Sequence, residues 1–250
     1  MGRQASLPLS RLSGHAGQMS AARIAMLSSA VLQFPYAVHR MASIELLTSH
    51  FGGVWRFLTN WNAIVQALYF GIALLNDLAG SNEKSLKKLP LLRRVRDYVY
   101  AAVAFPLAMF VGTTFWSLMA IDRELVFPKA LDPYFPTWLN HVLHTNIMLF
   151  VLLEMATSFR AYPRRSTALA GLIAFVLVYL AWTHVIFYVS GQWVYPVLEV
   201  LNVWQRAVFF LAMILYACVL YLIGEALNSY TWAKELQQVH SGKQHQRKKK

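Results

Sequence analysis

The chain has 250 residues, of which 57% are hydrophobic and only 14% are charged, and its net charge is +12. Soluble globular domains carry about 25% charged residues, so this composition excludes an ordinary soluble domain. The apolar residues are also clustered into runs of roughly 17 to 25, the length that crosses a bilayer as a helix. We therefore predict an all-α, polytopic membrane protein.

The expected elements follow one another in a simple order. Residues 1–20 are polar and contain glycine and serine, which predicts a disordered N-terminal tail. Residues 21–232 are expected to form one helical membrane domain, and residues 233–250 a basic cytoplasmic tail. The six expected spans are Ala21 to Val38, Val54 to Leu78, Tyr98 to Ile121, Thr137 to Ala156, Ala168 to Val189, and Val203 to Leu227. Pro35 and Pro106 fall inside spans, where a membrane helix tolerates a kink.

Positive charge is divided unevenly between the two ends of these spans. The N-terminus, the loops after spans two and four, and the C-terminus hold 18 of the 23 lysines and arginines, and the other three loops hold five. This asymmetry predicts that both termini are cytoplasmic. The charge is then a topology signal with a secondary role at anionic lipid head groups, and it does not indicate nucleic acid. We expect span one to be an uncleaved anchor, because removal of a signal peptide would break the alternation.

The cellular compartment is less clearly indicated than the topology. The chain ends in Arg247-Lys248-Lys249-Lys250, which resembles a dibasic retrieval signal only in part. We therefore favour the plasma membrane and keep the endoplasmic reticulum as the alternative.

Aromatic residues gather near the predicted outer ends of the spans. Trp55 and Trp61 flank the start of span two, Trp138 begins span four, and Trp193 and Tyr195 follow span five. Indole and phenol rings are enriched at membrane interfaces, so we interpret all five as an outer aromatic belt.

Polar residues occur inside two of the spans. In span two, Thr59, Asn62 and Gln66 are spaced at i, i+3 and i+7 and share one helix face. Such residues often hydrogen-bond across membrane helices, which is our first interpretation for Asn62 and Gln66. In span four, His141 and His144 also share a face, and polar groups placed in hydrocarbon are often functional.

The polar residues of spans two and four are expected at similar depths in the membrane. Thr59 and His144 are both expected roughly 7 to 11 Å below the outer boundary, and His184 of span five lies at a comparable depth. A threonine hydroxyl and an imidazole can form a nucleophile and its base. Because the sequence cannot show that the helices touch, this pair and a structural hydrogen-bonding role both stay open at this point.

Other chemistries fit less well. Diiron lipid hydroxylases need many histidines on cytoplasmic faces, whereas only His141, His144 and His184 are expected inside spans, all on the outer side. The sequence has no His-Glu-x-x-His zinc motif and no Gly-x-Ser-x-Gly elbow. A metal site would depend on His141 and His144 alone, so we expect no metal and no cofactor.

Several blocks of the sequence resemble one family, the androgen-induced and androgen-dependent TFPI-regulating membrane proteins. The resemblance covers about Phe51 to Trp232, and residues before it match poorly. The blocks are Gly53–Thr59, Ala104–Pro106, Phe115–Trp116, Asp122–Lys129, Leu131–Asp132, Trp138–Thr145, Tyr162–Pro163, Gly191–Pro196 and Leu222–Asn228. Separate blocks in the right order are more specific than any single motif.

The resemblance implies an activity and a site. Members of the family hydrolyse fatty acid esters of hydroxy fatty acids with a threonine and a histidine, which fall on Thr59 and His144. It also implies a supporting role for His141. The expected partners are a lipid ester substrate and membrane lipids, and no protein partner is indicated. The main alternative is a non-enzymatic membrane regulator of tissue-factor-pathway inhibitor, and a transporter is third.

Three further residues are candidates for supporting roles. Asn62 and Asn140 are candidate oxyanion donors. Arg56, one turn above Thr59, is a candidate partner for the free carboxylate of the lipid, or it extends to the interface. Such a site should accept long acyl chains and reject phospholipids, because burying unpaired polar groups costs several kcal/mol. Triacylglycerols should be rejected for their bulk.

Overall fold

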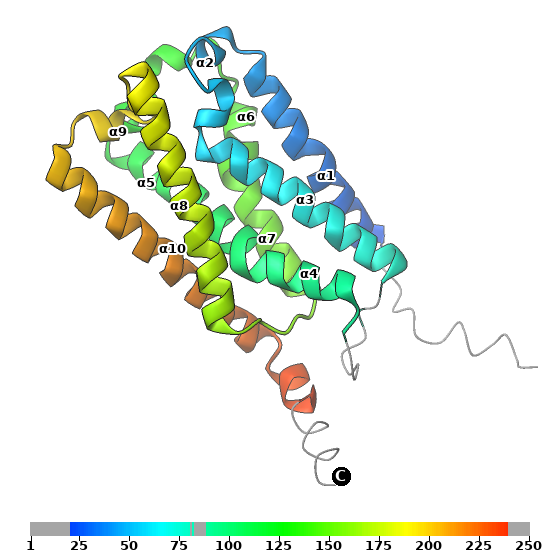
Figure 1. Cartoon of the computed structure of the whole chain (residues 1–250). Helices are drawn as coiled ribbons and strands as arrows, with labels where there is room; N and C mark the ends of the chain where they lie inside the picture. Colours follow the sequence, from blue (N-terminus) through cyan, green and yellow to red (C-terminus); the bar gives the residue numbers. More distant parts are fainter. Residues whose placement is uncertain (1–20, 81, 83–88, 240–250) are drawn as a thin grey trace, which may run out of the picture.

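The computed structural model describes residues 21–80, 82 and 89–239, which form a bundle of long helices (Figure 1). No strand occurs among these residues. The expected N-terminal tail and residues 240–250 of the expected C-terminal tail lie outside the described part of the chain, whereas residues 233–239 are helical.

Six helical segments are long and apolar enough to cross a membrane, which confirms the predicted six-span, all-α architecture. They are α1 (Ala21–Ala42), α3 (Leu58–Ala79), α4 (Leu91–Val99) with α5 (Phe105–Ile121), α6 (Thr137–His141) with α7 (Ile147–Thr157), α8 (Arg165–Ser190) and α10 (Val203–Thr231). Short π-helical segments, Tyr100–Ala104 and Val142–Asn146, join α4 to α5 and α6 to α7. The connections contain α2 (Glu45–Thr48), α9 (Pro196–Glu199) and 3₁₀ turns at Gly53–Arg56, Arg123–Leu125 and Lys129–Leu131.

The start of the second span differs from the prediction. Its α-helix, α3, begins at Leu58 rather than at Val54. Gly52 and Gly53 have φ angles of +81° and +49°, a left-handed conformation that glycine adopts easily, and they turn the chain into the 3₁₀ segment. Phe57 is then extended, with φ −90° and ψ 128°, and ends that segment. Thr59 therefore lies in the first turn of α3.

The third span, in contrast, starts earlier than predicted, at Leu91 instead of Tyr98. The charges in its first turns made this part look like a loop. In the fold, however, Arg96 is fully buried, pairs with Asp97 at 2.6 Å and donates to the Phe159 carbonyl at 3.1 Å. Because these charges are paired, the helix can continue through them.

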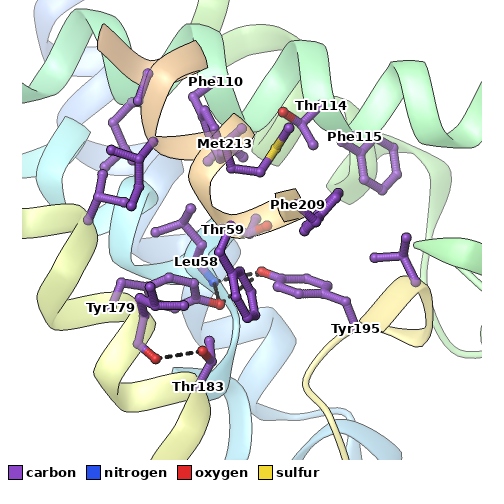
Figure 2. Close-up of a pocket in the computed structure, with 18 of the residues that line it drawn as sticks. Leu58, Thr59, Phe110, Thr114, Phe115, Tyr179, Thr183, Tyr195, Phe209 and Met213 are labelled. Carbon is purple, nitrogen blue, oxygen red and sulfur yellow. Dashed lines mark hydrogen bonds between the residues drawn. The ribbon is translucent and has the colours of Figure 1, made fainter. Parts of the chain in front are cut away.

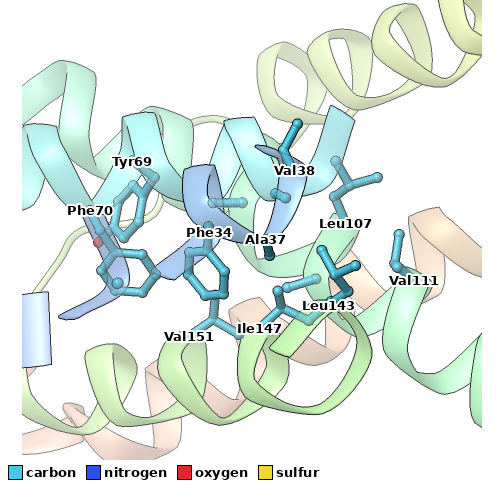
Figure 3. Packing of buried hydrophobic residues seen from close by; sticks show 14 of the residues in the cluster. Phe34, Ala37, Val38, Tyr69, Phe70, Leu107, Val111, Leu143, Ile147 and Val151 are labelled. Carbon is cyan, nitrogen blue, oxygen red and sulfur yellow. The ribbon is translucent and has the colours of Figure 1, made fainter. Parts of the chain in front are cut away.

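The hydrophobic core lies between α1, α3, α5 and α7 (Figure 3). The Phe34 ring of α1 lies between Phe70 of α3 and Phe150 of α7, at centroid distances of 6.3 and 5.8 Å. Lipid tails are as apolar as these side chains, so close packing rather than water exclusion stabilises such contacts in a membrane. This packing fixes α3 relative to α6 and α7, the helices that carry the polar residues of interest.

Helices α8 and α10, which lie along one flank of the bundle in Figure 1, are less buried than the spans in its middle. In the spans built from α4–α5 and α6–α7, 44% of the most apolar window is buried, against 22% in α8 and in α10. Helices α8 and α10 therefore present most of their surface outward.

One end of the bundle holds a buried group of charges, the inner ion-pair cluster of Arg23, Asp77, Glu154 and Arg160. Glu154 pairs with Arg160 at 2.9 Å and with Arg23 at 2.8 Å, and Arg23 pairs with Asp77 at 2.6 Å. Tyr69 donates to Glu154 at 2.8 Å. The helix ends that adjoin the lysine- and arginine-rich segments lie at this end, which we call the inner end after the predicted topology.

Candidate active site

A cavity of about 140 Å³ lies toward the opposite, outer end of the bundle (Figure 2). Its walls come from α3, α5, α8, α10, the π-helical segment of the fourth span and the two outer loops that follow α5 and α8. Most of the lining side chains are apolar. The polar ones are Thr59, Thr114, His144, Tyr179, Thr183 and Tyr195.

Thr59 reaches this cavity because α3 begins just before it. The glycine turn and the extended Phe57 end the preceding segment, so Thr59 is the second residue of the helix. The first turn of an α-helix leaves its amide groups without intrahelical partners and carries the positive end of the helix dipole. The side chain of Thr59 is thus placed beside amide donors and positive potential.

His144 comes from the π-helical segment that interrupts the fourth span. A π-helix shifts the amide partner of a carbonyl from i+4 to i+5, and such segments are frequent at functional sites. His144 Nδ1 lies 3.0 Å from the Asn140 carbonyl oxygen and 2.7 Å from the Asn140 side-chain oxygen. A backbone carbonyl only accepts, so the proton is on Nδ1 and Nε2 is left as an acceptor.

Two contacts fix the position of the His144 ring. Phe115 of α5 stacks on it, with ring centroids 3.6 Å apart and an interplanar angle of 10°. Gly112, one turn earlier in α5, lets this helix approach, because a Cβ there would lie 2.5 Å from the His144 carbonyl oxygen and 2.5 Å from the Met148 sulfur. The imidazole is therefore held by packing as well as by Asn140.

The two predicted site residues meet. Thr59 Oγ1 lies 3.3 Å from His144 Nε2, so the second and fourth spans are in contact at these two side chains, a point that the sequence had left open. With the proton on Nδ1, the threonine hydroxyl donates to Nε2. A hydroxyl in contact with an imidazole that a third group orients is the arrangement of an activated nucleophile. Here the third group is Asn140, an amide in place of the usual carboxylate.

A pair of tyrosines that line the cavity contacts the start of α3. The Leu58 amide donates to Tyr179 Oη at 2.9 Å and to Tyr195 Oη at 3.0 Å. The two phenol oxygens are 3.0 Å apart, and the Tyr179 hydroxyl donates to the Arg56 carbonyl at 2.9 Å. These contacts tie α8 and the following loop to the residues around Thr59.

The interpretation of all five outer aromatics as a belt was wrong for part of the set. Trp55 and Trp138 are exposed, as a belt requires. Trp193 is buried and stacks on Phe187 with centroids 4.3 Å apart. Tyr195 turns inward to the cavity. A ring that is apolar with a polar tip suits an interface and a buried network equally well, so the sequence pattern does not separate the two.

The four residues predicted to support the site, Asn140, Asn62, His141 and Arg56, occupy different environments. Asn140 contacts the His144 ring through its amide oxygen, so it orients the imidazole rather than facing an oxyanion. Asn62 is fully buried, accepts from Gln66 at 2.9 Å and does not line the cavity, in agreement with the packing interpretation. His141 is exposed, contacts Thr145 Oγ1 at 3.2 Å and stacks on Trp116.

Arg56 is half-buried and packs over the Phe57 ring at 4.7 Å, outside the cavity lining. Its burial lowers the pKa of the guanidinium, which nevertheless keeps its charge at neutral pH. A carboxylate-binding role for Arg56 stays a prediction. His184, expected at the same depth as Thr59, is exposed and bonds to the Leu180 carbonyl at 2.8 Å, away from the site.

Sequence reasoning did not find Tyr179, Phe115 or the inward position of Tyr195. Tyr195 belongs to the Gly191–Pro196 block and Phe115 to the Phe115–Trp116 block, and these blocks were the signals that could have pointed to the two residues. Within the described part of the chain, no three histidine, cysteine, aspartate or glutamate side chains are grouped so that they could hold a metal ion.

Comparison with known proteins agrees with the resemblance in the sequence. Residues 22–229 match the family model described as FAR-17a/AIG1-like protein. This chain belongs to that family. It is 40% identical over 188 residues to the androgen-induced gene 1 protein of Homo sapiens, which covers 73% of this chain and 79% of that protein. The androgen-dependent TFPI-regulating protein of Mesocricetus auratus is 38% identical over 190 residues, covering 75% and 81%.

The human androgen-dependent TFPI-regulating protein is 34% identical to the chain over 181 residues, which are 72% of this chain and 78% of that protein. No solved structure matches the chain. The family match starts at residue 22, so it includes the first span, which the sequence blocks had left out. Membership therefore covers all six spans and establishes an integral, multi-pass membrane protein.

Proposed function

We propose that this FAR-17a/AIG1-like protein is a membrane carboxylic ester hydrolase with Thr59 as nucleophile and His144 as base. The observation that supports this most directly is the 3.3 Å contact between Thr59 Oγ1 and His144 Nε2 in a cavity whose lining is mostly apolar. The distance is slightly longer than a tight hydrogen bond, as is common before substrate binds.

In the first half of the reaction, Thr59 Oγ adds to the ester carbonyl carbon while His144 Nε2 takes the hydroxyl proton. The carbonyl oxygen becomes an oxyanion in a tetrahedral intermediate. The intermediate collapses as the bond to the alcohol oxygen breaks, and Nε2 returns its proton to that oxygen. The alcohol leaves, and the acyl group stays on Thr59. Asn140 keeps the ring in the tautomer that this sequence requires.

In the second half, water attacks the acyl-threonine and gives a proton to Nε2. Collapse of the second intermediate breaks the bond to Thr59 Oγ, which recovers the proton, and a free fatty acid leaves. No cofactor or metal takes part in these steps. The outer position of the site suits this sequence, because an acyl chain can lie among apolar walls while water reaches the ester from the interface.

The substrate class that we propose is fatty acid esters of hydroxy fatty acids, as the resemblance implies. The cavity walls from α5, α8 and α10 are aliphatic and aromatic, with Phe110, Phe209 and Met213 among them, and suit a long acyl chain (Figure 2). A large polar head group would have to enter these walls without partners, at a cost of several kcal/mol. Phospholipids should therefore be poor substrates.

The test uses the purified full chain in lipid nanodiscs. Wild type should release fatty acid from such an ester and should be labelled by a fluorophosphonate probe at Thr59, as peptide mass mapping would show. Thr59→Ala should lose both. Thr113→Ala is the matched control, because Thr113 is a threonine of α5 that bonds to Tyr216 at 2.8 Å and does not line the cavity. Labelling that persists in Thr59→Ala would contradict the nucleophile assignment.

A second candidate is a non-enzymatic regulator of tissue-factor-pathway inhibitor, which the names of the androgen-dependent relatives favour. Expression of wild type or Thr59→Ala in endothelial cells separates the two. If the inhibitor's level changes equally with both forms, regulation does not need the hydrolase. If only wild type changes the inhibitor's level, that regulation depends on the hydrolase activity.

We further propose that both termini face the cytoplasm and that the protein resides in the plasma membrane, with the endoplasmic reticulum as the alternative compartment. The 18-to-5 division of lysine and arginine supports the orientation. Antibody access to an N-terminal tag and to an internal tag in the 191–202 loop, before and after permeabilisation, measures it. An N-terminal fluorescent fusion, which leaves the C-terminus free, reports the compartment.

A further inference from the structure

The hydrogen-bond network at the start of α3 contains one hydroxyl proton that can be redirected, that of Tyr195. The Leu58 amide is shared by Tyr179 Oη and Tyr195 Oη, and the Tyr179 hydroxyl donates to the Arg56 carbonyl. A phenol has a single proton, so Tyr179 has no further donor. Tyr195 contacts the amide as an acceptor, and its own proton is left to point at Tyr179 Oη or into the cavity.

Tyr195 is also close to the reacting atoms. It lines the same cavity as Thr59 and His144, and its Oη is 3.0 Å from the amide nitrogen of the residue before Thr59. Figure 2 shows its hydroxyl directed at the first turn of α3. Burial raises the pKa of Tyr195, so its phenol keeps its proton at neutral pH. A hydroxyl proton can change direction by rotation about the C–O bond, without movement of any heavy atom.

We propose that Tyr195 is a catalytic residue that donates a hydrogen bond to the oxyanion formed when Thr59 adds to the ester carbonyl. This inference rests on the proposed hydrolase function. The hydroxyl turns from Tyr179 to the carbonyl oxygen as negative charge develops there, while the Leu58 amide and the packed ring hold the phenol in place. Donors fixed in position before the reaction stabilise the transition state more than the ground state.

The Thr59 amide is suited to be the second donor. Its α-helical acceptor would be the Trp55 carbonyl, four residues earlier. That oxygen already accepts from the indole nitrogens of Trp61 at 2.7 Å and Trp182 at 3.0 Å. A carbonyl oxygen has two lone pairs, and both are used. The amide of the nucleophile is thus left at the positive end of α3, beside the place where the oxyanion forms.

The other candidate donors are less suitable. Asn62 does not line the cavity, and the Asn140 side chain is used by His144 through its oxygen. Thr114 remains, because its hydroxyl is buried, has no hydrogen-bond partner among the described residues and lines the cavity from α5. Thr114 is therefore the competing candidate in the experiment.

The experiment compares an ester with its thionoester, in which sulfur replaces the carbonyl oxygen. Sulfur is a weak acceptor, so the thionoester reacts slowly where an oxyanion donor acts. We expect Tyr195→Phe to lower kcat for the ester by about 10²- to 10³-fold, the loss seen for one oxyanion donor, with KM little changed. The ratio of ester to thionoester rates should fall along with kcat. A purely structural role would lower both rates alike and leave the ratio unchanged.

The matched control is Tyr216→Phe, which removes the phenol that bonds to Thr113 at 2.8 Å outside the cavity lining. Both its kcat and its rate ratio should equal those of wild type. A second approach keeps the shape of the site: ring-fluorinated tyrosines of increasing acidity at position 195. The rate of the ester should vary with phenol acidity while the enzyme stays folded.

The outcomes separate this inference from the function on which it rests. If wild type hydrolyses the ester but Tyr195→Phe keeps its kcat or its rate ratio, Tyr195 is not the donor, and the hydrolase assignment stands. A flat fluorotyrosine series leads to the same conclusion even if Tyr195→Phe fails to fold. If Thr114→Val instead lowers the ratio, Thr114 is the donor. If wild type neither turns over nor is labelled at Thr59, the proposed function itself is wrong.

Discussion

The protein places polar side chains inside the membrane in two regions that are arranged in opposite ways. In the inner ion-pair cluster, Arg23, Asp77, Glu154 and Arg160 are charged and paired, with side chains at most 9% exposed, and Arg23 of α1 links α3 and α7. At the outer end, Thr59 and His144 are uncharged groups that touch each other and line a cavity. Both regions connect helices that are distant in the sequence.

The difference shows how a structural and a chemical role can be separated in a membrane protein. Charges in hydrocarbon persist when partners compensate for their lost hydration, and the inner cluster satisfies this with ion pairs. A group that reacts needs a lone pair or a proton that is not already engaged, and it must face a space that a substrate can enter. Only the outer region offers this, because its hydroxyl and imidazole border the cavity. Substitutions should therefore affect stability at the inner end and turnover at the outer end.

The largest effect is expected at Thr59 and His144. Thr59→Ala or His144→Ala should lower kcat by about 10⁴-fold or more, because each removes one half of a unit that acts together. The double variant should be no slower than either single one. Steady-state hydrolysis in nanodiscs measures this, and an unchanged thermal unfolding profile confirms folding. An additive loss in the double variant would show that the two residues act separately.

The next effect is on stability at the inner end. Glu154→Gln removes the common partner of Arg23 and Arg160 and should destabilise the fold by about 3–5 kcal/mol, the cost of breaking a buried ion pair. Turnover per folded molecule should stay that of wild type. The control is Glu225→Gln, which breaks a pair of 2.6 Å with Arg165, whose side chain is 69% exposed. Exposed pairs contribute about 0–1 kcal/mol.

Unfolding in a denaturing detergent, followed by circular dichroism, compares these two carboxylate variants. Equal stability of Glu154→Gln and Glu225→Gln would show that burial does not decide the strength of these pairs. A fall in kcat of the folded Glu154→Gln protein would show that the inner and outer regions are coupled.

Gly112→Ala tests how far the outer site depends on helix packing. The added Cβ would lie 2.5 Å from the His144 carbonyl oxygen, so α5 and the π-helical segment must move apart. A displacement of about 1 Å can lower a rate by about 10²-fold, and we expect a loss of that order. Gly71→Ala in α3 is the control, since nothing lies within 4 Å of its new Cβ. Equal kcat values for these two variants would contradict the packing argument.

The smallest effect is expected at His141. Its ring contacts Thr145 and Trp116 on an exposed face, so His141→Gln should change stability by about 0.5 kcal/mol or less and leave kcat close to that of wild type. His144 is only three residues away, so the difference in kcat between His141→Gln and His144→Ala tests most directly whether an effect on turnover requires contact with the cavity. A large loss of kcat in His141→Gln would restore the supporting role that the family resemblance implies.

The architecture could be predicted because the bilayer dictates it. A span needs a long apolar run, and each of the six runs in the sequence became a span. The errors fall where local geometry or pairing decides. The start of α3 depends on the φ angles of Gly52 and Gly53, and the start of the third span depends on the pairing of Arg96 with Asp97. Neither follows from hydropathy.

Only part of the candidate site could be predicted from the sequence. Counting residues at constant helical rise along two spans suggested that Thr59 and His144 lie at one depth, although α3 begins at Leu58 and not at Val54, where that count started. The orientation of Asn140 depends on the π-helical segment, and the stacking of Phe115 on His144 depends on how α5 packs. Tyr195 is far from Thr59 in the sequence, and its inward position results from the loop that follows α8. These are tertiary facts that no local pattern contains.

The loose packing of α8 and α10 has a consequence for the concentration of the proposed lipid substrate. These helices form one wall of the cavity and have only 22% of their apolar windows buried, so their outer surfaces adjoin the bilayer. A lipid ester dissolved in that bilayer is counted as a mole fraction of the membrane rather than as moles per litre of buffer. Adding inert phospholipid at constant ester should therefore slow the reaction by surface dilution, although the bulk concentration of the ester stays the same.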